Sequence, residues 1–139
     1  METMTPAPVR TQKTTSYGRQ IAWTLTIAFA LSATHTCYGW VTGIGDPSFT
    51  VTTPVAWLFY LVGFGSAALA VRRERWAQVL LTVFLAVLLW VAVFWYPTTF
   101  TARQQTTFGW FENDVYTGLL MIALYLSVQR LRRVRLSLS

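Results

Sequence analysis

Four apolar stretches dominate the pattern of hydrophobic and polar positions along the chain. They cover about residues 21–41, 55–71, 77–96 and 110–129, and charged or turn-forming residues separate them. A helix that crosses a bilayer core of about 30 Å needs roughly 20 mostly apolar residues. The pattern therefore predicts an all-α integral membrane protein, in which residues 20–129 form a four-helix bundle.

The fourth stretch is the least regular of these predicted helices. Its uncharged part, residues 115–128, is too short to cross a bilayer alone. A span of sufficient length must begin near Trp110, which places Glu112, Asn113 and Asp114 in its first turns. Acidic residues and Asn near a helix N-terminus satisfy free N–H groups and complement the helix dipole, so a capping role is one explanation for them.

Basic residues are distributed unevenly among the segments that flank the four stretches. Every Lys and Arg except Arg103 lies in residues 1–19, 72–75 or 130–139. Because positively charged segments remain on the cytoplasmic side, we expect both termini in the cytoplasm of a cell whose inner (plasma) membrane holds the protein. Residues 1–19 are predicted to be a flexible tail, since they contain Pro and Thr without apolar periodicity, and residues 130–139 a basic tail.

Composition and charge agree with this interpretation. Hydrophobic residues make up 54% of the chain and charged residues 12%, against roughly 25% charged in soluble proteins, which argues against a soluble fold. The net charge of +6 follows from the topology and calls for no nucleic acid partner. A basic inner rim instead favours binding of anionic phospholipids, through Arg72, Arg73, Arg75, Arg130, Arg132, Arg133 and Arg135.

Small side chains recur at helical spacing in three of the predicted helices. In lipid, such residues allow helices to pack closely. The third stretch is almost uniformly Leu, Val, Phe and Ala, which is typical of a lipid-facing helix. We therefore expect the first, second and fourth helices to pack together and the third to lie outside, against the second. The predicted packing residues are Ala28, Ser32, Gly39, Gly63, Ser66, Ala67, Ala70 and Gly118.

His35 is the strongest candidate for chemistry, because an ionisable residue within a membrane span is expensive and often functional. An imidazole can exchange protons near neutral pH or ligate a metal or haem. The alternative is a polar contact that holds a neighbouring helix.

Glu112 and Asp114 are the candidate partners of His35. They lie two positions apart, about 200° around a helix, so they cannot both face the interior. Asp114 shares a stripe with Gly118 and Tyr125. We therefore expect Asp114 to face inward and Glu112 to face outward with Tyr116, and a pair between His35 and Asp114 or Glu112 is the sharpest structural hypothesis.

Other residues argue against catalysis. One Cys excludes an intramolecular disulfide, and one His with one Cys does not support a structural zinc site. Ser66 is predicted to lie near the cytoplasmic side, too far from His35 for a nucleophile and base pair. We expect no enzyme activity, no cofactor and no metal.

The interpretation that remains is a non-catalytic accessory or assembly subunit of a larger bacterial membrane complex, of the respiratory, secretory or cell-envelope type. Phe108, Trp110 and Phe111 favour it, because aromatic residues at such density suit docking to a partner, although an ordinary aromatic belt also explains them.

The alternative is a small proton-coupled transporter or channel that acts as a homodimer. In size the chain resembles the small multidrug exporters, which work as dimers. That family carries an embedded Glu in its first helix, and the first stretch here has no acidic residue.

Overall fold

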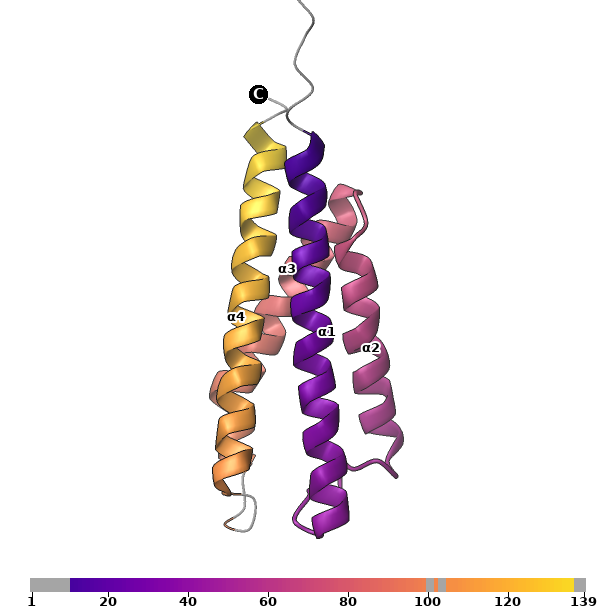
Figure 1. Ribbon diagram of the computed structural model, residues 1–139, viewed down its shortest axis with the longest axis vertical. Helices are drawn as coiled ribbons and strands as arrows, with labels where there is room; N and C mark the ends of the chain where they lie inside the picture. Colours follow the sequence, from indigo (N-terminus) through magenta and orange to yellow (C-terminus); the bar gives the residue numbers. More distant parts are fainter. Residues whose placement is uncertain (1–10, 100–101, 103–104, 137–139) are drawn as a thin grey trace, which may run out of the picture.

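The computed structural model is an up-and-down bundle of four helices (Figure 1) and describes residues 11–99, 102 and 105–136. No strand occurs in these residues, so the prediction of an all-α fold with four helices is confirmed. The helices are α1 (Thr11–Thr42), α2 (Pro54–Ala70), α3 (Arg75–Trp90) with the π-helical η1 (Val91–Trp95) and the 3-10 helix η2 (Tyr96–Thr99), and α4 (Thr107–Leu136).

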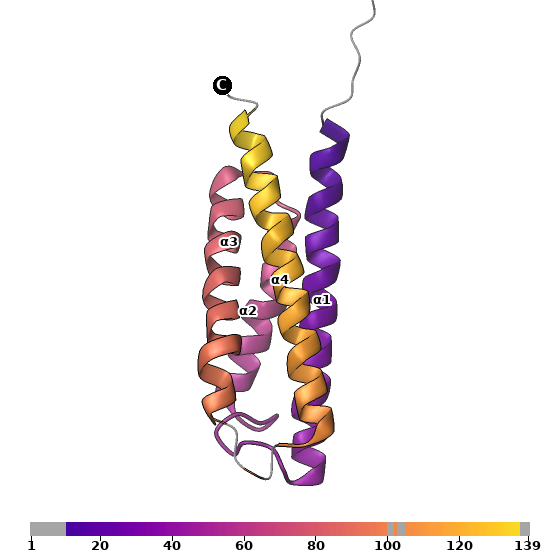
Figure 2. The same cartoon turned by 90° about the vertical axis from the view of Figure 1, so that its left-hand side faces the viewer.

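The helices form a ring in chain order. α1 packs between α2 and α4, and α3 packs between the same two helices on the opposite side, as Figures 1 and 2 together show. The backbones of α2 and α4 do not approach each other. The expectation that α3 lies outside a bundle of the other three helices is therefore wrong. Leu81 and Leu85, one turn apart on α3, are both buried, which the uniformly apolar sequence of this helix did not indicate.

The two ends of the bundle differ in composition. Both α1 and α4 extend past the α2–α3 turn at the end where the termini lie (Figure 2). We call this the basic end, because it carries the exposed side chains of Arg72, Arg73 and Arg75. The opposite end, formed by the 43–53 segment and η2, is called the loop end. α1 begins at Thr11, within the segment predicted to be a flexible tail, and residues 1–10 and 137–139 lie outside the described part.

Glycine and proline determine the connection between α1 and α2. Gly43 adopts a positive φ of 68°, which ends α1 in the left-handed conformation that suits glycine. The N–H groups of Ile44 and Gly45 then donate to the Gly39 carbonyl at 3.0 and 2.9 Å. Pro54 follows in the first turn of α2, where its missing N–H leaves no bond unmade.

Proline also shapes the end of α3. Pro97 cannot donate a backbone hydrogen bond, and its ring would clash with the carbonyl four residues earlier in a regular helix. The chain widens into the π-helical turn of η1 before Pro97 and tightens into η2 around it. α4 then begins at a Thr cap, where the N–H of Gly109 donates to the Thr106 hydroxyl at 3.0 Å.

Phe29 is the centre of the core. Its side chain is fully buried, and its ring lies 5.7 Å from that of Phe59 and 6.0 Å from that of Tyr116, both edge-on. Gly63 on α2 leaves the space that the ring occupies. The buried apolar cluster to which Phe29 belongs is called the apolar layer, and it also contains Ile21, Leu25, Leu81, Leu85, Leu120 and Ala123.

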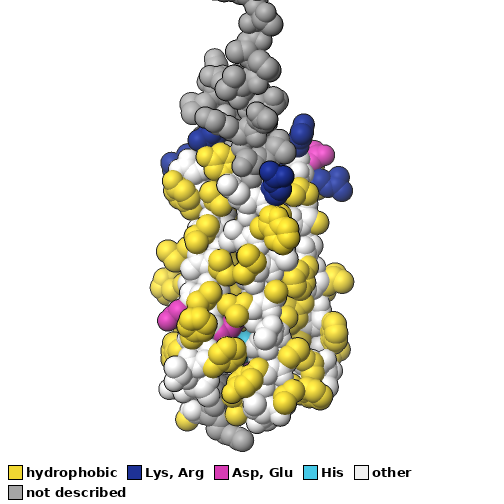
Figure 3. All heavy atoms as spheres, viewed as in Figure 1, with side chains coloured by type: hydrophobic (Ala, Val, Ile, Leu, Met, Phe, Trp, Pro, Cys, Tyr) yellow, Lys and Arg dark blue, Asp and Glu magenta, His cyan; other side chains and the backbone are white. Residues whose placement is uncertain are grey.

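Large apolar side chains also cover the outside of the bundle. Figure 3 shows them over most of its length, with Lys and Arg gathered at the basic end. Leu61, for example, is 73% exposed. We call this surface the apolar belt; it includes Trp23, Ile27, Leu58, Leu61, Val79, Leu80, Val83, Val87, Phe94, Met121 and Ile122. Within the described residues one helix, Arg75–Thr99, is long and apolar enough to cross a membrane, and α2 is apolar but shorter.

The contact between Gly63 and Phe29 can be tested by adding one methyl group. A Cβ on Gly63 would overlap the Phe29 ring, which its aromatic neighbours hold in place. We expect Gly63→Ala to lower the free energy of unfolding by about 1–2 kcal/mol, because overpacking outweighs the gain in helix propensity. The measurement is thermal unfolding of the purified chain in detergent, followed by circular dichroism.

Gly65→Ala is the matched control, because nothing lies within 4 Å of a Cβ at Gly65. This variant should be unchanged or more stable by up to about 1 kcal/mol. Equal stability of the two variants would contradict close packing at Gly63.

Candidate functional site

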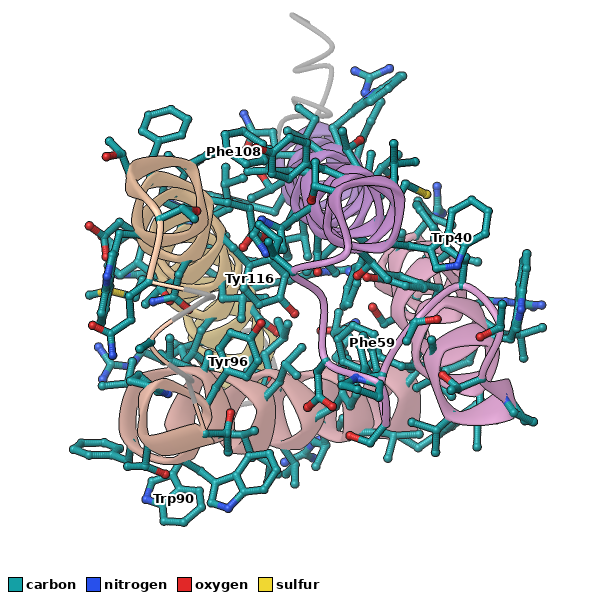
Figure 4. The ribbon with its side chains drawn as sticks, turned by 90° about the horizontal axis from the view of Figure 1, so that it is seen from below. Trp40, Phe59, Trp90, Tyr96, Phe108 and Tyr116 are labelled. Atoms are coloured by element: carbon teal, nitrogen blue, oxygen red, sulfur yellow. The ribbon has the colours of Figure 1, made fainter. Side chains whose placement is uncertain are left out.

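Polar side chains from the elements that surround the interior meet near the loop end. Figure 4 views the bundle from this end and shows Tyr96 and Tyr116 directed into it, whereas Trp40 and Trp90 point away. We call this group the polar cluster, and it consists of His35 and Thr36 on α1, Tyr60 on α2, Tyr96 on η2, and Glu112 and Tyr116 on α4.

His35 and Glu112 form the central pair of the polar cluster. The His35 Nδ1 atom lies 3.9 Å from Glu112 Oε2, which is close enough for an ion pair but too long for a direct hydrogen bond. Glu112 is only 4% exposed, and His35 Nδ1 is buried without a hydrogen-bond partner in the described part of the chain. Phe108 stacks on the imidazole at 5.6 Å. The structure thus brings together one of the two pairs that the sequence predicted.

The predicted orientation of the two acidic residues is wrong. Glu112 is buried and Asp114 is exposed. The side of α4 that faces the interior runs through Glu112, Tyr116, Leu120, Ala123, Ser127 and Arg130, all of them buried. The stripe that contains Asp114 faces outward, where Tyr125 is 62% exposed and a Cβ on Gly118 would meet no atom within 4 Å.

Tyr60 links α2 to α1 within the polar cluster. Its hydroxyl donates to the Ser32 carbonyl at 3.0 Å and lies 2.5 Å from the Thr36 hydroxyl, in a hydrogen bond between the two side chains. Deeper in the bundle, the Tyr116 and Thr117 hydroxyls are buried and have no hydrogen-bond partner among the residues described. Buried polar atoms are normally hydrogen-bonded, so this cluster differs from ordinary packing.

A pocket of about 60 Å³ lies beside the polar cluster at the loop end. This volume has room for a few water molecules. Residues from α1, the following loop, η2 and the start of α4 line it: His35, Thr36, Gly39, Ile44, Gly45, Asp46, Phe49, Tyr96, Thr99 and Gly109.

Arg130 has a structural role at the basic end. It is 4% exposed, and its Nη1 and Nη2 atoms donate to the carbonyls of Ala70 at 2.5 Å and Arg72 at 2.7 Å, which caps the end of α2. Its guanidinium therefore faces the protein, contrary to its predicted place among the lipid-binding arginines. Among the others, Arg72, Arg73, Arg75, Arg132 and Arg133 are exposed, and the side chain of Arg135 lies outside the described residues.

The predicted packing residues mostly lie between helices. Ala28, Gly39, Gly63, Ser66, Ala67 and Ala70 are buried, and Ser32 is half-buried. Gly118 is the exception, since no atom approaches it closely.

The aromatic residues at the start of α4 differ in their exposure. Phe108 packs against His35 and Tyr38 of its own chain, with ring centroids 5.6 and 5.0 Å apart. Trp110 and Phe111 remain 42% and 59% exposed.

The sequence interpretation did not include Thr36, Tyr60 or Tyr96 among the site residues. The sequence feature that could have identified these three residues is a polar side chain within an apolar stretch, because such a side chain needs a hydrogen-bond partner where water is absent. Hydroxyl groups are too common in these stretches for that signal alone to separate these three residues from the rest.

Comparisons with protein-family models, curated proteins and solved structures found no match for this chain. In the part of the chain that the structure describes, no group of three or more His, Cys, Asp or Glu side chains is placed to hold a metal ion. The polar cluster, the two ends and the apolar belt are the features of this chain that bear on its function.

The capping role of Arg130 leads to a stability test. We expect Arg130→Gln to lower the free energy of unfolding by about 2–3 kcal/mol, because hydrogen bonds from a buried charged group are lost and carbonyls of α2 are left without them. Chemical unfolding in detergent measures the change. Arg132→Gln is the control, because Arg132 is exposed, and it should stay within about 0.5 kcal/mol of the unsubstituted chain. A loss of the same size in both variants would contradict a specific cap.

Proposed function

We propose that this chain is an integral membrane protein of a bacterial inner membrane, with four spans and both termini in the cytoplasm. The apolar belt supports this proposal, because so many exposed apolar side chains along a bundle are unfavourable in water. The arginines of the basic end support the orientation.

The polar residues of α1 and α4 are compatible with lipid. On α1, the hydroxyls of Thr24, Thr26 and Thr34 donate to the carbonyls four residues earlier, so they leave no unsatisfied donor. On α4, Glu112 and Ser127 face the interior. These residues make both helices polar by composition, although much of their outer surface is apolar.

Labelling of single cysteines tests this topology. In a Cys37→Ala background, Ser48→Cys and Glu74→Cys place one thiol at each end, both at exposed positions. We expect a membrane-impermeant maleimide to label Ser48→Cys in intact cells and Glu74→Cys only after the membrane is opened. Labelling of both thiols from the same side would contradict an up-and-down bundle that crosses the membrane.

The function that we propose is that of a non-catalytic accessory or assembly subunit of a larger membrane complex. The apolar layer around Phe29 carries this proposal, because among the described residues it lies between the polar cluster and the polar groups at the basic end. The nucleophile candidates are also unsuited to catalysis with His35. Ser66 donates to the Gly63 carbonyl at 2.6 Å beyond that layer, and Cys37 is exposed.

Phe111 provides the test of this function. An epitope-tagged chain, extracted from its native membrane in mild detergent, should migrate on a native gel with larger proteins in fixed ratio, which mass spectrometry identifies. We expect Phe111→Ala to weaken this association, because exposed aromatics at the loop end are the proposed contact. Phe94→Ala is the control, since Phe94 is similarly exposed on η1.

A chain that migrates alone would contradict the subunit proposal. Migration as a homodimer would instead favour the second candidate function, a proton-coupled transporter. The observation that favours this second function is the buried pair of His35 and Glu112.

A further inference from the structure

We propose that His35 and Glu112 together bind one exchangeable proton, and that the proton reaches this site only from the loop end, through the pocket that His35 lines. The assignment of the loop end to the outside of the cell rests on the proposed topology, whereas the proton site itself does not.

The distance between the two side chains is that of an ion pair. At 3.9 Å, Nδ1 and Oε2 are too far apart for a direct hydrogen bond, and Nδ1 is buried, so one proton can be held by either side chain without contact with bulk water. The pocket that His35 lines has room for roughly four water molecules. Thr36, Asp46 and Tyr96 also line this pocket and supply polar partners for such water.

The charges around the pair favour one bound proton. Among the residues described, the titratable groups near it are Cys37 on α1, Tyr60 on α2, Tyr96 on η2, Tyr116 on α4 and Asp46 in the loop, and none is Lys or Arg. Glu112 therefore has no permanently charged partner within the described part of the chain. Without a proton the pair carries one buried negative charge, which is unfavourable. With one proton, on either residue, the pair has no net charge.

The interior beyond the pair limits access to one side. Tyr116 packs edge-on against Phe29, and Leu25 and Leu120 complete the apolar layer toward the basic end. The next polar contact lies past this layer, where the hydroxyls of Thr82 and Ser127 are 2.7 Å apart. Water in the pocket therefore connects the pair with the loop end alone.

Infrared spectroscopy of the full chain in lipid vesicles tests the proton site. The protonated carboxyl of Glu112 should give a C=O stretch that titrates with pH. We expect Glu112→Gln to remove this band and Asp114→Asn to leave it unchanged, since Asp114 is exposed two positions away. His35→Gln should shift the midpoint of the titration by about one pH unit or more, because sites that share a proton interact this strongly.

Three outcomes would overturn the proposal. They are the lack, in the unsubstituted chain, of any band of Glu112 or His35 that titrates with pH, the persistence of the C=O band in Glu112→Gln, and an unshifted midpoint in His35→Gln. Circular dichroism confirms that each variant is folded. Should Glu112→Gln fail to fold, Glu112→Asp retains a carboxyl and must show a titrating band with a shifted midpoint.

Sealed vesicles test the access from one side. Maleimide labelling of Ser48→Cys in the Cys37→Ala background gives the orientation of the loop end in these vesicles, and a pH step on that side alone should change the band. A response to a step on the basic-end side alone would overturn one-sided access. The proposed topology fails separately, if labelling in intact cells shows the loop end in the cytoplasm while the band still titrates.

Discussion

The contact between the Phe29 ring and Gly63 organises the interior of this bundle. The Phe29 ring lies where α1 and α2 approach each other. The ring fits there only because Gly63 has no side chain. The ring and its apolar neighbours divide the interior into two polar regions. The polar cluster lies on the loop side, and Gln78, the Thr82–Ser127 hydrogen bond and Arg130 lie on the other side. This separation is the basis for the proposed access to the polar cluster from the loop end.

Specific contacts must hold the helices together if lipid surrounds them. Lipid chains are as apolar as the core, so burial alone favours association far less than it does in water. The structure supplies other contacts between neighbouring helices. Tyr60 bonds α2 to α1, the Thr82 and Ser127 hydroxyls join α3 to α4, and Arg130 spans from α4 to the end of α2. Together with the close packing of small residues beside Phe29, these contacts would hold the helices to one another in lipid, where burial of apolar surface contributes little.

The sequence predicted the number and type of the helices but not how α3 and α4 are rotated about their axes. Apolar length and the charges between stretches determine where a helix lies, and both can be read directly. The rotation of a helix depends on which of its faces contacts the neighbouring helices. On α4, one face contains Asp114 and another contains Glu112, and the small residue Gly118 on the Asp114 face led to the wrong choice. On α3, both faces are apolar, so nothing in the sequence distinguished the buried Leu81 and Leu85 from the exposed Val83.

Phe108 connects the two proposals for the loop end. Its ring stacks on His35, and Trp110 and Phe111 follow it in the first turns of α4. A stacked ring interacts more strongly with an imidazolium than with a neutral imidazole, because its face attracts positive charge. If the shared proton moves to His35, the contact with Phe108 becomes stronger, and the start of α4 is held more firmly against α1. A partner docked on Trp110 and Phe111 would then bind a surface whose position depends on the proton, and by linkage its binding would change the affinity of the pair for that proton.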